Sequence, residues 1–215
     1  MKYKGRIATF FLVLGINSIH MAYYYIRDGF ISGMEYIGLP FLVILSLWLG
    51  RQYDRAKFLS EKDALTGIYN RRYVEGIFFK IKAAADRKGH GIAVLFIDVN
   101  NFKTINDHFG HKEGDNLLKA ISSQLKKSSK DTDIVARWGG DEFIILSPGT
   151  LKTDNTHELM ERIHQNLKMI STTNIEISVS IGTAIYPSEG NTLDDLLKIA
   201  DEKMYNMKIR LKALC

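Results

Sequence analysis

The spacing of apolar residues divides the chain into an N-terminal segment and a longer remainder. Residues 7–26 are apolar and carry no formal charge, about the length that a helix needs to cross a bilayer. A second apolar stretch covers residues 31–50 and is interrupted by Glu35. The first stretch has no small-residue cleavage site, which favours an anchor over a removable signal peptide. The pattern therefore predicts a two-helix transmembrane hairpin over residues 1–50.

Flanking charges set the orientation expected for this hairpin. Basic residues lie before the first stretch and after the second, at Lys2, Lys4, Arg6, Arg51, Arg55 and Lys57. The positive-inside rule then places both ends in the cytoplasm, as in a multi-pass protein of the cell membrane. His20 and Glu35 fall in the outer half, where ionisable groups suggest sensing. We favour the simpler interpretation, in which Glu35 lies among headgroups and His20 bonds to a neighbouring helix.

Residues 51–62 are rich in charge and contain neither glycine nor proline. This composition predicts a helix that continues the second apolar stretch. A rigid helix transmits rotation or association, whereas a flexible linker does not. We therefore expect residues 51–62 to form a helical signalling linker and residues 63–215 to form a cytoplasmic domain.

Helix-like and strand-like patterns alternate along residues 63–215. Helical periodicity is present at residues 73–85, 114–127, 156–170 and 193–208, and strand patterns at 92–97, 133–136, 143–146 and 175–181. The order β-α-β-β-α-β is typical of ferredoxin-like folds. The pattern predicts an α/β (α+β) fold with a mostly antiparallel central sheet.

Two glycines followed by two carboxylates stand between the second and third of these strands, in Trp138-Gly139-Gly140-Asp141-Glu142. Gly-Gly between strands predicts a hairpin turn whose bare backbone admits a phosphate or base. Adjacent carboxylates are hard oxygen ligands for Mg²⁺. Such sequences are also ordinary turn chemistry, so this motif alone leaves an empty turn as the stronger interpretation.

A second polar cluster follows the apolar strand at residues 92–97. Asp98 stands at its end, at the rim of a sheet where α/β sites are usually built. Lys103 then offers a positive charge to a phosphate, and Asn106 and Asp115 offer groups that pair with the edge of a guanine. A polar loop with a helix cap remains the competing interpretation of this cluster alone.

Composition narrows the class of protein. The chain has 215 residues, 46% of them hydrophobic and only 3 of them proline, so it is neither disordered nor of low complexity. Its one cysteine, Cys215, excludes an intrachain disulfide and favours a reducing compartment. The net charge of +5 is modest and much of it flanks the apolar stretches, so nucleic acid is not an expected partner.

Taken together, the motifs resemble those of the GGDEF domain, from about Ser60 to the C-terminus. The matching segments are Asp63-x-Leu65-Thr66-Gly67-Ile68-x-Asn70-Arg71-Arg72, Phe96-x-Asp98, Phe102-Lys103-x-x-Asn106-Asp107-x-x-Gly110-His111-x-x-Gly114-Asp115 and Arg137-x-Gly139-Gly140-Asp141-Glu142-Phe143. The resemblance implies a palm-type fold and a bacterial diguanylate cyclase, which makes the second messenger cyclic di-GMP from two GTP. It also implies a homodimer in which each domain holds one GTP.

Residue roles follow from the same resemblance. Asp98, Asp141 and the backbone carbonyl of Val99 would bind Mg²⁺ or Mn²⁺, and Asp141 or Glu142 would help to take the proton. The expected substrate-binding residues are Lys103, Asn106, Asp115, Gly139, Gly140, Lys208 and Lys212. The family's inhibitory Arg-x-x-Asp motif corresponds to residues 130–133, where Lys130 replaces arginine and Asp133 is kept. We therefore expect weak or absent product inhibition.

Other departures bear on activity. Asn100 replaces an aspartate that is frequent in the family, and Trp138 replaces a tyrosine. Near the end, Leu211 and Lys212 stand where glycine and arginine are usual, and lysine lacks the bidentate fork of arginine. Two alternatives follow: an active membrane-anchored cyclase, which the intact acidic motifs favour, or a degenerate domain that binds GTP or a partner without turnover.

Overall fold

The computed structural model describes residues 4–30, 33–149, 153–171 and 177–213. The chain divides into two compact units, Met1–Ser60 and Glu61–Cys215.

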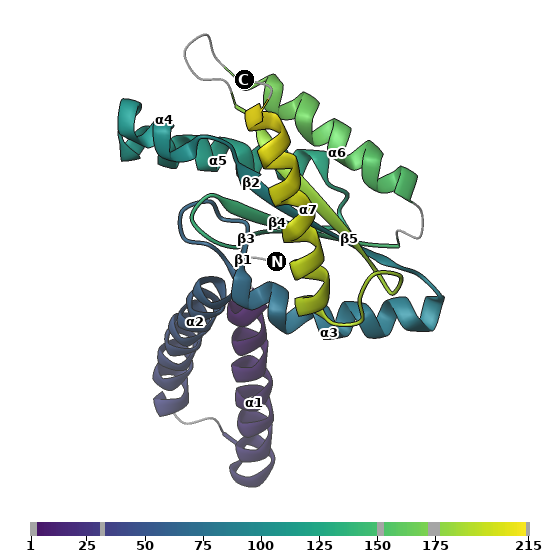
Figure 1. The fold of residues 1–215 in the computed structure, drawn as a ribbon. Coiled ribbons are helices and arrows are strands. Elements are labelled where there is room, and N and C mark those ends of the chain that lie inside the picture. The colour runs from purple at the N-terminus through teal and green to yellow at the C-terminus, as the bar shows by residue number, and fades with distance from the viewer. Residues whose placement is uncertain (1–3, 31–32, 150–152, 172–176, 214–215) are drawn as a thin grey trace. The chain divides into compact units, whose positions relative to one another are not determined.

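The first unit is a helical hairpin of α1 (Lys4–Asp28) and α2, which begins at Gly33 and ends at Glu61 (Figure 1). The helices contact each other through small and polar residues. The backbone N–H of Gly5 donates to Asp54 Oδ1 at 2.7 Å, and Thr9 Oγ1 donates to the carbonyl of Ser46 at 2.9 Å. A Cβ at Gly50 would lie 2.6 Å from the Cα of Arg6, so the approach needs glycine there.

One helix among the described residues, α1, is long and apolar enough to span a membrane by length and composition. A hairpin of two membrane spans is not established by this finding and stays a prediction. The helix predicted beyond the second apolar stretch is present, because α2 continues through residue 61. His20 contacts the ring of Tyr24, with 4.7 Å between ring centroids, and the side chain of Glu35 lies outside the described part of the chain.

The second unit is built on a five-stranded sheet in the order β1-β3-β4-β2-β5. Its strands are β1 (Tyr69–Asn70), β2 (Ile92–Val99), β3 (Ile134–Arg137), β4 (Glu142–Pro148) and β5 (Val179–Tyr186). β1 and β3 are parallel and the other three pairs are antiparallel, which confirms the mostly antiparallel sheet. From β2 to β5 the elements follow the predicted β-α-β-β-α-β order.

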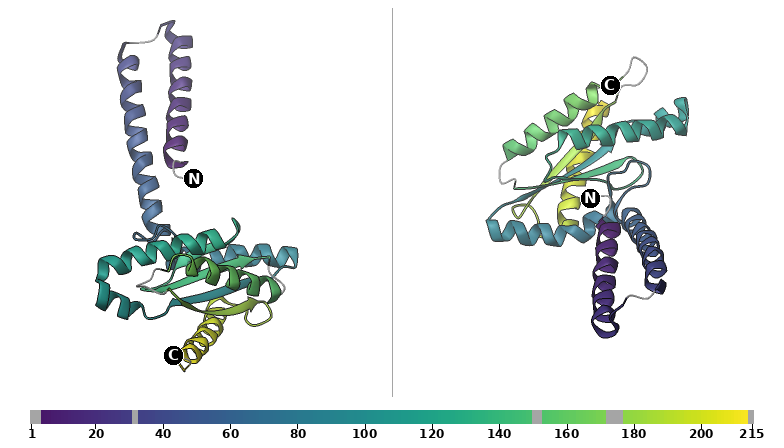
Figure 2. Two further views of the ribbon diagram at one scale, coloured as in Figure 1. Left: turned by 90° about the horizontal axis from the view of Figure 1, so that it is seen from above. Right: turned by 180° about the vertical axis from the view of Figure 1, so that it is seen from behind.

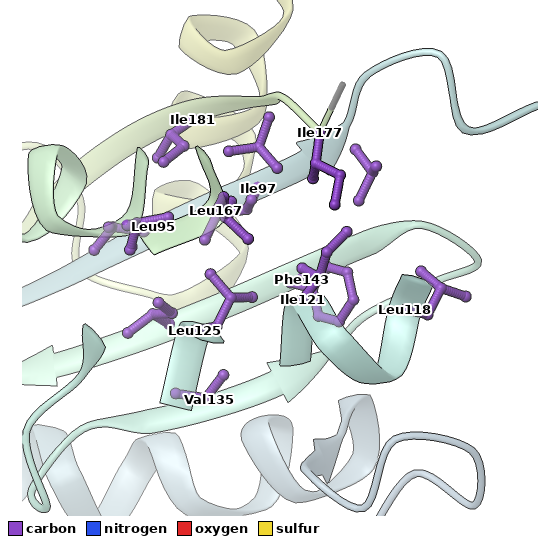
Figure 3. Close-up of a cluster of buried hydrophobic side chains, with 14 of the residues drawn as sticks. Leu95, Ile97, Leu118, Ile121, Leu125, Val135, Phe143, Leu167, Ile177 and Ile181 are labelled. Carbon is purple, nitrogen blue, oxygen red and sulfur yellow. The ribbon is translucent and has the colours of Figure 1, made fainter. Parts of the chain in front are cut away.

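Helices cover both faces of this sheet (Figures 1 and 2). They are α3 (Arg71–Lys88), α4 (Phe102–Phe109), α5 (His111–Ser128), α6 (Thr153–Lys168) and α7 (Leu193–Ala213). One core lies between the sheet and α5 and α6 (Figure 3), and the other lies between the sheet and α3 and α7. Every residue of β2 is buried, and alternate side chains enter the two cores, so the continuous apolar run at its start is explained.

The structure differs from the sequence patterns at three elements. The polar cluster after Asp98, for which a polar loop is the competing interpretation, is helical over most of its length, and Gly110, with φ of 84°, separates α4 from α5. The last strand is shifted: β5 covers Val179–Tyr186, whereas the alternating pattern predicts 175–181, of which 175 and 176 lie outside the described residues. The short strand β1 has no apolar run of its own and is not predicted at all.

Candidate active site

Three carboxylates meet where β2 ends and β4 begins. Asp98 lies directly opposite Glu142 in the antiparallel register of these strands, and it is only 8% exposed. The backbone N–H of Val99 donates to the carbonyl of Asp141 at 3.2 Å, which ties the residue before β4 to the end of β2. Sheet register thus brings together residues that stand more than forty positions apart in the sequence.

The crowding of these acids changes how they titrate. Burial raises the pKa of Asp141, and the neighbouring charge of Asp98 raises it further. Burial also raises the pKa of Glu142, with added repulsion from Asp141, Asp98 and Asp201. The ionised forms of Asp141 and Glu142 are therefore less stable at this site than they would be in water. Such a cluster favours the arrival of a cation or a proton.

Lys208 supplies one cation from α7. Its Nζ lies 2.5 Å from Asp98 Oδ1, and both side chains are largely shielded from water. Its positive charge also opposes the rise in the pKa of Asp141 and Glu142. The predicted phosphate-binding lysine therefore lies at the carboxylate cluster. The side chain of Lys212, four residues further on in α7, is outside the described residues.

The turn between β3 and β4 presents open backbone beside the acids. The N–H of Trp138 donates to the carbonyl of Glu142 at 2.8 Å and closes the hairpin. A Cβ at Gly139 would lie 2.5 Å from Glu142 Oε2, whereas nothing lies within 4 Å of one at Gly140. Glycine at the first position thus leaves room for the glutamate, and the second position is open to an incoming group.

Arg137 holds this turn, a role that the sequence motifs do not assign to it. Its Nε and Nη2 donate to the carbonyl of Gly140 at 3.1 and 2.7 Å, and Nε also reaches the carbonyl of Gly139 at 3.1 Å. Its Nη1 lies 3.3 Å from Asp63 Oδ1. Asp63 in turn accepts from the backbone N–H and the hydroxyl of Thr66, at 2.9 and 2.6 Å.

The charge state of Asp63 reflects these bonds. Burial alone would raise its pKa, but the hydrogen bonds from Thr66 and the charge of Arg137 outweigh burial and lower it. Asp63 is therefore ionised and fixed in place. Asp63 and Arg137 both belong to motifs that match the family, and this is the one sequence feature that could have indicated their ion pair. Neither motif alone shows that the two side chains touch.

The predicted guanine-binding residues lie on α4 and α5. A Cβ at Gly114 would lie 1.9 Å from Asn106 Oδ1, so the asparagine packs directly against the glycine backbone. Asn106 Oδ1 is buried and has no hydrogen-bond partner among the described residues. A buried acceptor without a partner suits recognition of a ligand N–H. Asp115 lies beside Gly114 on α5 and Lys103 lies on α4, and both are exposed.

Asn100, the departure from the family's usual aspartate, has a structural explanation. Its Nδ2 donates to Ser178 Oγ at 3.2 Å, and its Oδ1 accepts from Ser180 Oγ at 2.8 Å. An ionised aspartate has no donor for the first of these bonds. The amide thus joins the segment after β2 to β5, next to Asp98.

The turn at residues 130–133 lies at the other end of β3 from the glycine turn. The backbone N–H of Lys130 donates to Asp133 Oδ2 at 2.8 Å, and Ser147 Oγ donates to Asp133 Oδ1 at 2.9 Å. Both oxygens of this carboxylate are therefore engaged within the protein. The structure does not test product inhibition at Lys130 and Asp133, which stays a prediction.

The donor set suits a magnesium ion that shares its ligands with a nucleotide. No group of three or more acidic, histidine or cysteine side chains with metal-binding spacing is found among the described residues. Mg²⁺ in nucleotide sites, however, uses one or two carboxylates and completes its shell with substrate phosphates and water. Asp98 pairs with the ammonium of Lys208, which balances part of the negative charge at these two strand ends.

Comparisons with known proteins agree with this geometry. Over 153 residues, the chain is 34% identical to the cyclic di-GMP phosphodiesterase NbdA of Pseudomonas aeruginosa, covering 70% of this chain and 19% of NbdA. It is 38% identical over 153 residues to the diguanylate cyclase DosC of Escherichia coli, covering 69% of this chain and 33% of DosC. The chain thus spans a third or less of these two relatives.

A solved structure shares the fold. The GGDEF domain of YfiN, also called TpbB, from Pseudomonas aeruginosa superposes with a TM-score of 0.64 at 33% identity, covering 67% of this chain and 92% of that one. Residues 60–212 match the family model described as "Diguanylate cyclase, GGDEF domain". That match covers well over half of the chain, and the signature residues lie together at one end of the sheet. The protein belongs to the GGDEF domain family.

Proposed function

We propose that this protein is a diguanylate cyclase, which joins two GTP into cyclic di-GMP and releases two pyrophosphates. The observation that carries the proposal is the convergence of Asp98, Asp141 and Glu142 beside an open glycine turn, with Lys208 on Asp98. Relatives such as DosC carry the name diguanylate cyclase.

The reaction asks the protein to hold polyanions and to move a proton. The 3′-hydroxyl of one GTP attacks the α-phosphate of the other, a P–O bond forms and pyrophosphate leaves. Asp141 or Glu142 receives the hydroxyl proton, and their raised pKa makes each a better acceptor than an ordinary carboxylate. Lys208 and Lys103 neutralise phosphate charge. The open backbone at Gly140 lets the triphosphate approach closely.

Asp98, Asp141 and the carbonyl of Val99 would hold Mg²⁺ or Mn²⁺. A bound divalent ion would lower the pKa of the attacking hydroxyl and offset the charge that grows on the phosphate. Without this ion, the acids repel one another and the substrate. This mutual repulsion, together with burial, is what raises the pKa of Asp141 and Glu142.

Guanine recognition falls to α4 and α5. The buried Oδ1 of Asn106 would accept from the base, and the exposed carboxylate of Asp115 would pair with the neighbouring N–H donors. One such set in each chain recognises one base, so two chains must face each other to join two nucleotides. We therefore propose that the active species is a homodimer.

The first unit would anchor the enzyme in the cell membrane, with the cyclase domain in the cytoplasm. Many large apolar side chains of both helices are exposed, including Phe11, Ile19, Ile37, Phe41, Ile44 and Trp48. The contacts between the helices use small and polar groups instead, such as Gly5, Gly50, Thr9 and Ser46. This division, apolar outside and small or polar between helices, is typical of packing within lipid.

Product analysis tests the proposal. The detergent-solubilised full chain is incubated with GTP and Mg²⁺, and nucleotides are separated by chromatography and identified by mass. The active cyclase yields cyclic di-GMP and pyrophosphate, and Asp141→Ala yields neither. If the wild type binds GTP and makes no product, the proposal fails and the domain is a GTP-binding or scaffold protein. That outcome would implicate Leu211 and Lys212.

A further inference from the structure

Phe79 on α3 is the most exposed large apolar side chain among the described residues of the second unit, at 78%. Its neighbour Phe78 is buried in the core between the sheet and α3 and α7. That core is therefore packed without Phe79, and packing within the domain does not explain a large ring at this position. A single exposed ring is ordinary on a protein surface, so its meaning depends on what surrounds it.

The ring lies on a face of α3 that is otherwise small and basic. Positions 72, 76, 79, 80 and 83 share this face because side chains three or four residues apart are neighbours on a helix. We call these residues the outer face of α3: Arg72, Gly76, Phe79, Lys80 and Ala83. All but Ala83 are exposed. Within the described part of the chain, neither Arg72 nor Lys80 forms a salt bridge.

The acids near this face do not cancel its positive charge. The helix, Arg71–Lys88, contains six basic and two acidic residues. Both acids, Glu75 and Asp86, already form an ion pair with a basic residue of the same helix. Glu61, from the segment before α3, acts on Tyr73, which is partly buried on another side of the helix from the ring. The outer face therefore combines net positive charge with an apolar ring.

The chain that precedes α3 is short enough to keep this face near a bilayer. Beyond the second apolar stretch, which ends at residue 50, residues 51–61 of α2 rise by roughly 16 Å. Only residues 62–70 then lead to the start of α3. The cytoplasmic surface of a cell membrane carries anionic headgroups, whose charge is opposite to that of the outer face. Chain length and charge thus favour the same partner.

We propose that the outer face of α3 docks on anionic headgroups of the membrane that anchors the chain. Arg72 and Lys80 pair with lipid phosphates, and Phe79 enters between the headgroups. Gly76 has no side chain, so the helix can approach the surface closely. A helix that presents basic side chains beside an exposed aromatic ring is suited to lie in the plane of the interface. This inference rests on the proposed membrane anchor and not on cyclase activity.

A fluorescent label in the middle of the outer face tests docking on the full chain. Gly76→Cys in a Cys215→Ser background gives one labelling site, and a Cβ at residue 76 meets nothing within 4 Å. The label is NBD, which emits at shorter wavelength in a bilayer than in water. The chain is reconstituted in nanodiscs of phosphatidylglycerol or phosphatidylcholine, and lipids brominated on their acyl chains quench a label that enters the bilayer. Glu161→Cys, at an exposed position on α6, carries the control label.

Docking predicts a blue shift and quenching at residue 76 in phosphatidylglycerol, little of either in phosphatidylcholine, and neither at residue 161. Arg72→Gln/Lys80→Gln should lower the ratio of docked to undocked label roughly thirtyfold, because each cation at an anionic surface contributes about fivefold. The matched pair Lys119→Gln/Lys198→Gln, exposed on α5 and α7, should keep the wild-type ratio. Phe79→Ala should reduce the quenching. Thermal unfolding should be unchanged in these variants, since the altered side chains are exposed.

Four results would overturn the proposal. They are equal signals in the two lipids, equal signals at residues 76 and 161, docking that survives in Arg72→Gln/Lys80→Gln, and a blue shift without quenching that grows with the number of chains in each nanodisc. The last would make the outer face a contact between two copies of the chain. A chain that does not co-elute with nanodiscs would refute the anchor and this inference with it. Cyclic di-GMP synthesis by the same samples reports on the cyclase proposal separately.

Discussion

Replacing Arg137 with alanine removes the side chain that holds the glycine turn. The guanidinium binds the carbonyls of Gly139 and Gly140 and pairs with Asp63, and it is only 17% exposed. Because the turn carries Asp141 and Glu142, its loss acts on the site as well as on the fold. The substitution leaves the carboxylate cluster itself chemically intact.

The magnitude follows from the number of bonds lost. Hydrogen bonds that involve a charged group contribute about 1.5–3 kcal/mol each when buried, but Gly140 is exposed and its carbonyl can turn to water. Asp63 keeps its two bonds from Thr66, which limits the cost of losing its partner. We expect Arg137→Ala to lower the free energy of unfolding by about 1–3 kcal/mol. For a domain of this size that lowers Tm by roughly 2–4 °C per kcal/mol.

A double-mutant cycle isolates the bridge. Asp63→Asn keeps an acceptor for Thr66 and removes the charge opposite Arg137. The two changes made together should cost less than their sum, with a coupling energy of about 0.5–3 kcal/mol. Thermal unfolding and cyclase kcat/KM are measured for wild type, both single variants and the double variant. Arg87→Ala, at an exposed position near the end of α3, is the matched control.

The outcome is decisive in either direction. Arg137→Ala should lower kcat/KM together with Tm, and Arg87→Ala should change neither. Full additivity of Arg137→Ala and Asp63→Asn, or a stable Arg137→Ala variant with unchanged kcat/KM, would refute the argument that this bridge holds the turn.

Three further predictions concern the site. Asp141→Asn should abolish activity yet raise the Tm of the metal-free protein at neutral pH. Because the pKa of Asp141 is raised in the folded protein, its ionisation lowers the stability of the wild type as the pH rises through that pKa. The gain in Tm should therefore vanish in acid, and thermal unfolding of both proteins across pH tests this. Gly114→Ala should raise KM for GTP more than it lowers kcat, because a Cβ 1.9 Å from Asn106 Oδ1 displaces that side chain; equal loss in both constants would argue against a binding role. Cyclic di-GMP should inhibit the enzyme weakly or not at all, since Lys130 lacks a guanidinium; tight binding that disappears in Lys130→Ala/Asp133→Ala would sink this expectation.

Some of the site follows from local pattern. The apolar run of β2 ends at an acid, and Gly-Gly between two apolar runs predicts the β3–β4 turn. These features depend on neighbours in sequence, so periodicity and turn chemistry reveal them. The β-α-β-β-α-β order of elements from β2 to β5 follows from the alternation of patterns along the chain.

Other parts depend on contacts that no local pattern encodes. Lys208 bonds to Asp98, from which it is separated by 110 positions in the sequence. Only the family resemblance assigns both residues to one site. No helix is predicted over α4, because its asparagine, aspartate and histidine residues are weak helix formers and leave a polar loop as a competing interpretation. The sequence pattern ends the last strand at residue 181 because Gly182 is a weak strand former, but β5 runs through Gly182 to Tyr186. A Cβ at Gly182 would lie 1.9 Å from the carbonyl of Ala200, so the close packing of α7 selects glycine within the strand.

We propose that the carboxylates at the glycine turn catalyse the joining of two GTP. The most direct measurement is the initial rate of cyclic di-GMP formation by the full chain with saturating GTP and Mg²⁺, beside Asp141→Ala and the surface control Asp131→Ala. The wild type and Asp131→Ala should form product, and Asp141→Ala should form none. Equal rates from all three proteins, or no product from a wild type that still binds GTP, would exclude this catalytic role.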